Sequence, residues 1–214
     1  HAGENHGHAG NGLEEFDTVS LIDFYVFEFV CVKLKDWINQ GKQAFPVSVN
    51  FSISSLIQSS FVEHLTGICT KYDISPEYLE IEVTEKIHDV EGLDIKSLII
   101  NLHNAGFAVA IDDFGTEYAN LALLSEIDFD VLKLDKSMID NIAVNPKTKT
   151  IVGLISGVCH DLGVHMVAEG IETEEQFMTL RSCGVDSVQG FLFSKPVPMK
   201  EYEERFLKTT DSEK

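Results

Sequence analysis

The chain has 214 residues, of which 44% are hydrophobic and 9% aromatic, enough for one globular domain with a substantial core. Its formal net charge of -19 argues against binding of DNA or RNA polymers, because proteins that bind a phosphate backbone cluster Lys and Arg on one surface. No uncharged apolar run reaches the roughly 18 residues typical of a membrane span, so we expect no direct membrane insertion.

The opening twelve residues, HAGENHGHAGNG, differ in composition from the rest of the chain. They contain four Gly and three His and no apolar residue that could anchor them to a core. His1, His6 and His8 could bind a metal ion, but a flexible segment or one added during cloning explains this composition better. We therefore expect residues 1–16 to lie outside the domain and residues 17–214 to form it.

The remaining sequence alternates between helical and strand-like patterns. The expected helices cover residues 18–40, 54–72, 93–106, 150–163 and 174–184, and the expected strands cover residues 45–52, 78–85, 107–115, 131–135, 164–172 and 185–194. Three helices stop at Gly106, Gly163 and Gly184, each immediately before an apolar strand. Glycine readily adopts the left-handed turn that ends a helix, so these positions are expected helix-to-strand loops.

This alternation predicts parallel strands joined by crossover helices. Polar residues recur within or near the C-terminal ends of these strands: Asn50, Glu82, Asp112, Asp113, Lys133, Glu169 and Gln189. In a (β/α) barrel such ends converge on one face, where barrel enzymes have their active sites. An open doubly wound sheet would gather ligands along a crevice instead, but no Gly-rich dinucleotide loop follows the first strand. The barrel is therefore the favoured fold.

Asp112 and Asp113 follow directly on the apolar segment AVAI. Two adjacent carboxylates at the end of a buried strand repel each other and are costly to desolvate, and a divalent cation would resolve both problems. Asn50 and the carboxylates form a hard, oxygen-rich ligand set that suits Mg²⁺ or Mn²⁺. Two such ions about 4 Å apart can activate water for phosphodiester cleavage. Lys133 could hold that water or a phosphate oxygen.

Other interpretations of these residues stay open. The aspartate pair could cap a helix, and Lys133 could be a surface lysine on a short strand. Lys133 could also be the nucleophile of a Schiff-base aldolase on the same barrel. The aldolase interpretation, however, gives no reason for so many carboxylates at the strand ends.

Six segments, VNFS, EIEVTE, IDDFGT, VLKLDKSMI, VAEGIET and QGFLFSKPVP, resemble in this order the successive motifs of the EAL domain. This is the family of cyclic di-GMP phosphodiesterases and their inactive receptor relatives, and the resemblance covers about residues 21 to 198. It implies a TIM-like (β/α) barrel that uses two Mg²⁺ or Mn²⁺ ions to hydrolyse cyclic di-GMP to linear pGpG.

The resemblance also implies a role for each matched residue. The metal ligands would be Asn50, Glu82, Asp112, Asp113 and Glu169. Lys133 and Glu169 would be the catalytic residues, and Gln189, Glu172 and Thr116 would bind substrate or support the loop after the aspartate pair.

The sequence departs from the family pattern in two places. The Glu-Ala-Leu motif and the Arg-Trp that follows it are absent, so the resemblance predicts a barrel lacking about two N-terminal strands before Leu21. Glu117 stands where the family has a glycine, and a glutamate is strained where glycine takes a positive φ. Two functions therefore stay open. The retained ligands favour a phosphodiesterase, whereas the missing glutamate and the altered loop favour an inactive cyclic di-GMP receptor or regulatory module.

The setting of the domain can also be predicted. Four widely spaced cysteines without a CxxC pair indicate reduced core thiols, and we expect a cytoplasmic domain. We expect a homodimer in bacterial signal transduction, with sensory or GGDEF domains in a longer parent protein that could be tethered to a membrane.

Overall fold

The computed structural model describes residues 18–90, 93–116 and 121–207. The His- and Gly-rich opening and Glu117 lie outside these residues, so the predictions made for them stay predictions. The strands are β1 (Val47–Asn50), β2 (Leu79–Thr84), β3 (Ala108–Phe114), β4 (Val131–Leu134), β5 (His165–Ala168) and β6 (Ser187–Val188). They form one parallel sheet in the order β1-β2-β3-β4-β5-β6.

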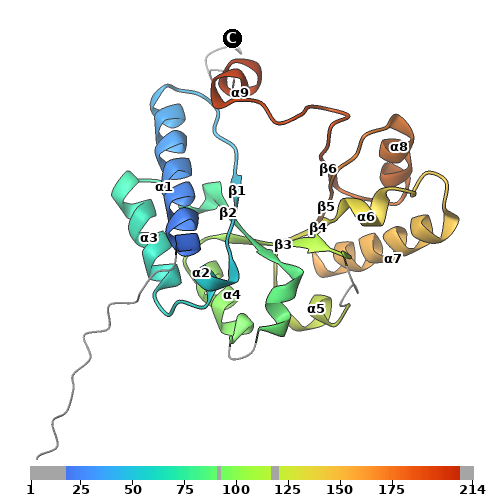
Figure 1. Cartoon of the computed structure of the whole chain (residues 1–214), viewed down its shortest axis with the longest axis horizontal. Helices are drawn as coiled ribbons and strands as arrows, with labels where there is room; N and C mark the ends of the chain where they lie inside the picture. The colour runs from blue at the N-terminus through green and yellow to red at the C-terminus, as the bar shows by residue number, and fades with distance from the viewer. Residues whose placement is uncertain (1–17, 91–92, 117–120, 208–214) are drawn as a thin grey trace, which may run out of the picture.

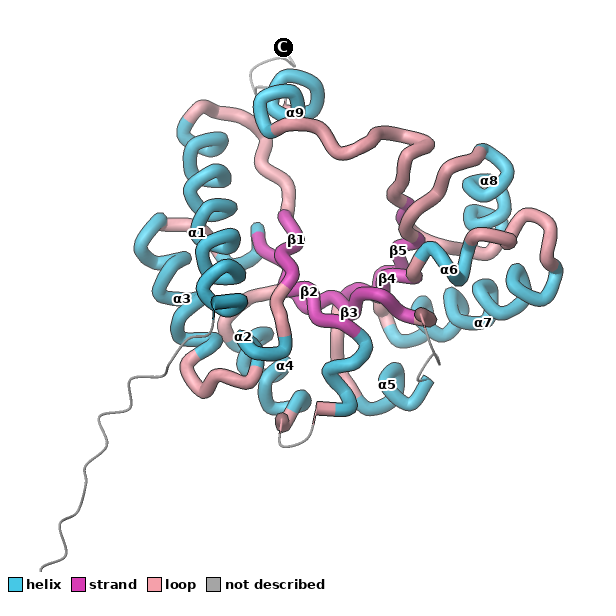
Figure 2. The backbone as a smooth tube through the Cα atoms, viewed as in Figure 1, coloured by secondary structure: helices cyan, strands magenta, loops and turns pink. Residues whose placement is uncertain are grey.

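The sheet curls into a half-barrel with helices on its outer side (Figures 1 and 2). Each strand pairs with the next strand in sequence, whereas a doubly wound sheet would reverse its strand order at a switch point. Among the described strands, β1 and β6 are the edges of the sheet and do not pair with each other. The predicted TIM-like fold is therefore confirmed, and the described strands form an open part of such a barrel.

The α-helices lie between or beside these strands. They are α1 (Thr18–Asn39), α2 (Ile53–Leu56), α3 (Phe61–Tyr72), α4 (Ile95–Asn104), α5 (Leu121–Glu126), α6 (Lys136–Ile139), α7 (Pro146–Leu162), α8 (Glu174–Ser182) and α9 (Met199–Phe206), and the 3₁₀ turns are η1 (Pro76–Tyr78) and η2 (Glu85–Asp89). The five predicted helical stretches each contain at least one of these helices, whereas α5, α6 and α9 were not predicted. Gly106, Gly163 and Gly184 have φ values of 91°, 75° and 84°, which confirms their predicted left-handed turns.

One predicted helix, residues 54–72, is wrong as a single element. The structure divides this stretch into α2 and α3, with residues 57–60 between them. Ser59 and Ser60 lie at the break, and Ser60 precedes α3 with a non-helical ψ of 10°. Serine favours helix ends and turns over helix interiors because its hydroxyl competes for backbone hydrogen bonds.

Aromatic and aliphatic side chains fill the space between the sheet and the helices. Phe27 of α1, Phe61 of α3 and Phe107 before β3 are at most 2% exposed. The rings of Phe51 and Phe61 meet edge to face, with centroids 5.0 Å apart. Cys31, Cys69 and Cys159 are buried free thiols and Cys183 is partly exposed. No helix in the described ranges is long and apolar enough to cross a bilayer.

The last helix returns to the first across the open side of the sheet. α9 lies beside the C-terminal half of α1 (Figure 1). The indole Nε1 of Trp37 donates a hydrogen bond to Glu203 Oε1 at 2.9 Å, and the rings of Trp37 and Tyr202 lie 5.9 Å apart. These contacts position the chain after β6 as one wall of the opening between β1 and β6.

Candidate active site

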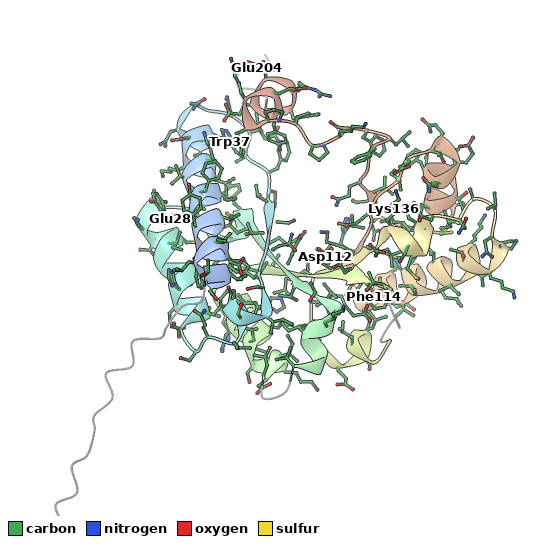
Figure 3. All side chains as sticks on the ribbon, in the orientation of Figure 1. Glu28, Trp37, Asp112, Phe114, Lys136 and Glu204 are labelled. Atoms are coloured by element: carbon green, nitrogen blue, oxygen red, sulfur yellow. The ribbon has the colours of Figure 1, made fainter. Side chains whose placement is uncertain are left out.

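The carboxyl ends of β2, β3, β4 and β5 bring four of the predicted site residues into direct contact. Lys133 of β4 is at the centre, and its Nζ lies 2.6 Å from Glu82 Oε1 of β2. The same Nζ lies 2.7 Å from Glu169 Oε1 after β5 and 3.1 Å from Asp112 Oδ1 of β3. Asp112 lies on the inner side of the curled sheet (Figure 3). The predicted convergence of these strand ends is therefore observed.

This cluster is buried and carries an excess of negative charge. The side chains of Lys133 and Glu82 are 9% and 5% exposed, and those of Asp112 and Glu169 are 14% and 20% exposed. Three carboxylates face one ammonium group, which leaves two negative charges in excess when all are ionised. Excess buried negative charge is energetically costly, and a bound divalent cation would remove this cost by neutralising the charge.

Lys133 is held in its charged form. Burial alone would lower the pKa of Lys133, but its hydrogen bonds with Glu169 and Glu82 outweigh burial and raise the pKa above its ordinary value. A Schiff-base lysine needs the opposite, a lowered pKa that frees its amine as a nucleophile. The surroundings of Lys133 therefore oppose the aldolase interpretation, and its burial opposes the interpretation as a surface lysine.

Two of the predicted site carboxyl groups have a pKa above the ordinary value. Burial raises the pKa of Glu169 in spite of the hydrogen bond from Lys133. Burial also raises the pKa of Asp113, and the neighbouring charge of Asp112 raises it further. A bound cation would oppose both effects by stabilising the ionised carboxylates.

Asp113 owes its position to a β-bulge in β3. Ile111 is opposite Leu132 of β4 and Phe114 is opposite Leu134, so β3 has one extra residue between these pairs. Asp113 takes a φ of 58°, a left-handed conformation that is uncommon for residues other than glycine. Bulges re-aim side chains next to active sites, and this one leaves Asp113 exposed while Asp112 contacts Lys133.

Gln189 and Asn50 complete the strand-end positions. The Gln189 side chain donates a hydrogen bond from Nε2 to Glu169 Oε1 at 2.6 Å, so one carboxylate oxygen contacts both Gln189 and Lys133. Asn50 is the last residue of β1 and is opposite Glu82 in the sheet register. Both side chains are exposed, and of the two only Gln189 has a hydrogen bond to a member of the cluster among the described contacts.

The loop after the aspartate pair shows a contact that the sequence reasoning missed. The backbone N–H of Gly115 donates to Glu85 Oε2 at 3.0 Å, so Glu85 fixes the start of this loop. Glu172 instead forms an ion pair with Lys136, and Thr116 is exposed. Residues 117–120 lie outside the described part of the chain, so the loop-supporting roles of Glu172 and Thr116 stay predictions.

The donor chemistry of the site fits Mg²⁺ or Mn²⁺. Asp112 Oδ1 is a buried oxygen that accepts no hydrogen bond, although Lys133 Nζ is close to it. The other ligand candidates offer carboxylate or amide oxygens, which these hard cations prefer. Among the described residues, no group of three or more His, Cys, Asp or Glu side chains is spaced to hold a metal ion. In the cluster, the Lys133 ammonium lies between the carboxylates. A cation would therefore require the Lys133 ammonium to shift.

A cavity of about 1050 Å³ opens beside this cluster, between β1 and β6. Glu169, Gln189, Glu172 and Lys136 line its polar side. Its apolar wall contains Trp37, Phe191, Phe193, Tyr202 and Phe206. The volume is slightly above the range for small-molecule sites, which is about 300–1,000 Å³.

Comparison with known proteins gives one consistent family. The family model described as "EAL domain" matches residues 10–196. A probable cyclic di-GMP phosphodiesterase of Escherichia coli, PdeB, is 34% identical over 194 residues, which is 89% of this chain and 35% of PdeB. The chain spans about a quarter to a third of the length of the curated relatives it matches.

Solved structures agree with this family. The EAL domain of Mycobacterium smegmatis DcpA has a TM-score of 0.81 and 31% identity, over 89% of this chain and 86% of that one. Klebsiella pneumoniae BlrP1, in a complex with manganese and cyclic di-GMP, has a TM-score of 0.74 and 31% identity, over 83% of this chain and 45% of that one.

Proposed function

The chain belongs to the EAL domain family, and on this basis we propose that it hydrolyses cyclic di-GMP to linear pGpG with the help of divalent metal ions. One observation carries the proposal: Lys133, Glu82, Asp112 and Glu169 meet in a buried cluster at the ends of four parallel strands. Relatives named as cyclic di-GMP phosphodiesterases and a neighbour bound to manganese and cyclic di-GMP support it.

We assign the metal-holding role to the oxygen donors of the strand ends: Asn50, Glu82, Asp112, Asp113 and Glu169. When bound, Mg²⁺ or Mn²⁺ ions in such a site supply an activated water and neutralise charge on the phosphodiester. Lys133, protonated because of its carboxylate neighbours, would direct one positive charge at a phosphate oxygen or hold the attacking water. Gln189 would keep Glu169 in a fixed orientation through their hydrogen bond.

The adjoining cavity is where we place the substrate. Its size suits a ligand as large as a cyclic dinucleotide. Lys195 on its wall supplies positive charge for the phosphates in an otherwise acidic protein, whereas Lys136 is paired with Glu172. Phe191 and Phe193 offer apolar surface for the bases.

We place this activity in the bacterial cytoplasm, within a longer signalling protein. The free thiols suit a reducing compartment, and the curated relatives are three to four times longer than the matched segment. Sensory or GGDEF domains in the parent protein, and dimerisation of the parent, are part of the proposal.

The assignment is tested by Asp112→Asn. The amide keeps the shape of the side chain but loses the charge that a cation needs, so we expect Mn²⁺-dependent pGpG formation to fall at least 100-fold. Product is measured by chromatography after incubation with cyclic di-GMP. Asp161→Asn, an exposed position on α7, is the matched control and should retain full activity. Equal activity of the two variants would exclude Asp112 from the site.

A further inference from the structure

Helix α1 packs on the residue that directly follows Asn50. That residue, Phe51, is 4% exposed, and its ring centroid lies 6.1 Å from that of Phe24 and 5.8 Å from that of Phe27. The backbone N–H of Phe51 donates to the Glu82 carbonyl at 3.1 Å. The chain just after Asn50 is therefore held from two sides, by β2 and by α1.

The next residue, Ser52, is anchored by a carboxylate of the same helix. Asp23 Oδ2 accepts hydrogen bonds from the Ser52 backbone N–H at 2.8 Å, from the Ser52 hydroxyl at 2.6 Å and from the Ser55 hydroxyl at 2.7 Å. Ser52 is at the N-cap position of α2, yet its side chain does not cap that helix and donates to Asp23 instead. Hydrogen bonds to a carboxylate are stronger than those between neutral groups, so Asp23 fixes the loop after β1 on α1.

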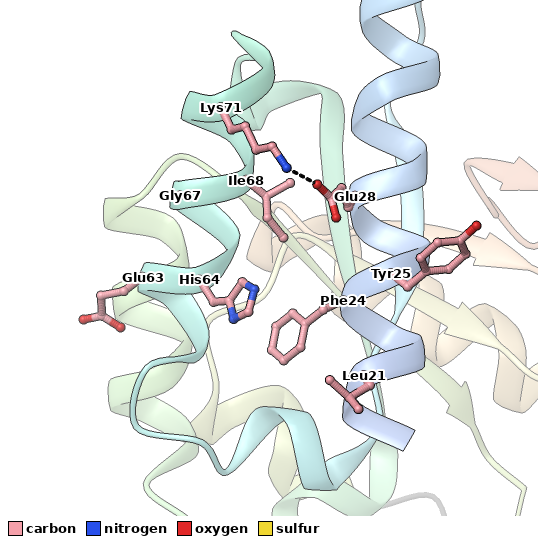
Figure 4. Close-up of a pocket in the computed structure, with 9 residues that line it drawn as sticks. All are labelled: Leu21, Phe24, Tyr25, Glu28, Glu63, His64, Gly67, Ile68 and Lys71. Atoms are coloured by element: carbon pink, nitrogen blue, oxygen red, sulfur yellow. Dashed lines mark hydrogen bonds and ion pairs between the residues drawn. The ribbon is translucent and has the colours of Figure 1, made fainter. Parts of the chain in front are cut away.

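Helix α1 is in turn fixed to α3 along the turns that carry Asp23. The rings of Phe24 and His64 are stacked, with centroids 4.2 Å apart and planes 5° apart. Glu28 Oε1 lies 2.6 Å from Lys71 Nζ. Figure 4 shows Phe24 and Glu28 pointing from α1 toward α3. Asp23 therefore projects from a helix that is held in place by contacts outside the Lys133 cluster.

We propose that Asp23 is a positioning residue for Asn50 and thereby sets how tightly the site holds a divalent cation. The inference rests on the proposed function, in which Asn50 is a metal ligand. Asn50 ends β1 and its side chain is exposed, so its direction depends on the backbone that Phe51 and Ser52 continue. Without the Asp23 carboxylate, Ser52 would lose the acceptor that fixes this backbone to α1.

Binding of Mn²⁺ to the chain without nucleotide tests this role, with the free Mn²⁺ measured by electron paramagnetic resonance. Removing a group that orients a metal ligand from outside the coordination sphere typically weakens metal binding about 10–100-fold, so Asp23→Ala should raise the Mn²⁺ dissociation constant at least about tenfold. Asp23→Asn keeps an oxygen acceptor and should restore part of the affinity. Ser55→Ala removes one of the three hydrogen bonds and should give a smaller change in the same direction.

Asp130→Ala is the matched control. Asp130 Oδ2 also joins two elements, because it accepts the Val109 N–H at 2.7 Å and lies 2.9 Å from His103 Nε2. Asp130 precedes β4 and is therefore at the amino end of that strand, away from the cluster. Asp130→Ala should lose stability in urea unfolding but bind Mn²⁺ as the unchanged chain does, which separates positioning from a general loss of stability.

The outcomes distinguish this inference from the proposed function. If Asp23→Ala binds Mn²⁺ as tightly as Asp130→Ala, the positioning role alone is overturned. Ser55→Ala supports the same comparison if Asp23→Ala does not fold, as judged by circular dichroism. An unchanged chain that does not bind Mn²⁺, or binds it equally well after Asp112→Asn, would overturn the proposed metal site and this role with it.

Discussion

The ammonium group of Lys133 in β4 contacts carboxylates at the ends of three other strands, β2, β3 and β5. Its contacts with Glu82 and Glu169 are short, and Asp112 is within ion-pair distance although it forms no hydrogen bond there. The positive charge of this lysine offsets the repulsion among the carboxylates, which would otherwise destabilise the half-barrel.

Glu85 holds the first residue of the loop that follows the aspartate pair. Its carboxylate accepts the Gly115 N–H at the start of the loop that follows the aspartate pair. Removing the acceptor with Glu85→Ala should lower kcat/KM about tenfold to a hundredfold, because an unmet backbone donor costs about 1–3 kcal/mol. Glu85→Gln keeps an oxygen acceptor and should lose less.

Steady-state rates of pGpG formation measure this difference. Glu63→Ala, an exposed position on α3, is the control for loss of one negative charge. If Glu85→Gln and Glu85→Ala lose activity equally, the charge of Glu85 and not its hydrogen bond is what matters.

Residues at strand ends could be predicted from the sequence, but residues that act through loops could not. Glu82, Asp112, Lys133 and Glu169 follow the strand pattern, and parallel strands bring their carboxyl ends together. Glu85 and Lys136 lie beyond the strands, where partners depend on turn geometry that no periodicity encodes. Residues 117–120, with Glu117 among them, are not described, so the expected effect of Glu117 stays a prediction.

The predicted strands and the longer helices are present, but the short helices α5 and α6 and the last helix α9 were not predicted, and the predicted strand 185–194 is only Ser187–Val188. Two further differences have a local cause. The break between α2 and α3 was missed because hydrophobic spacing continues across it, and only the serines at residues 59 and 60 signal a stop. The bulge in β3 was not predicted, because the two residues inside it, Asp112 and Asp113, are both polar and do not show which of them is the extra one. Both features depend on local backbone conformation and not on hydrophobic period.

The turn after β6 contains a tightly packed glycine, Gly190. Gly190 packs so closely on the next loop that an added Cβ would overlap the backbone N and O of Ile171. Ile171 N–H also donates to the carbonyl of Gln189, so any shift would move the residue that orients Glu169. Gly190→Ala should therefore lower the free energy of unfolding by about 2–3 kcal/mol and reduce activity.

Gly157→Ala is the matched control for this substitution. Gly157 lies inside α7, and a Cβ there meets no atom within 4 Å. Alanine is the better helix former, so stability should rise by about 1 kcal/mol. Urea unfolding of both variants measures the two changes, and a Gly190→Ala protein as stable as the unchanged chain would contradict the packing argument.

The described strands form a curled sheet. The Lys133 cluster lies at the carboxyl ends of β2 to β5, and the sheet is open between its edge strands. β1 and β6 are unpaired edges within the described chain, and the cavity lies between them. Unpaired edges are normally covered in native proteins, and in a closed barrel these two edges would be paired. The cluster around Lys133 nevertheless forms from β2 to β5 alone. Whether that cluster suffices for catalysis separates a phosphodiesterase from a cyclic di-GMP receptor.

Calorimetric titration of cyclic di-GMP into the chain, first with Mn²⁺ and then with Ca²⁺, tests this central claim most directly. Chromatography of the Mn²⁺ sample then shows whether pGpG has formed. The account predicts binding with both cations and pGpG in the Mn²⁺ sample. Binding without pGpG would contradict the proposed hydrolysis and identify a receptor, and no binding with either cation would contradict the proposed nucleotide site itself.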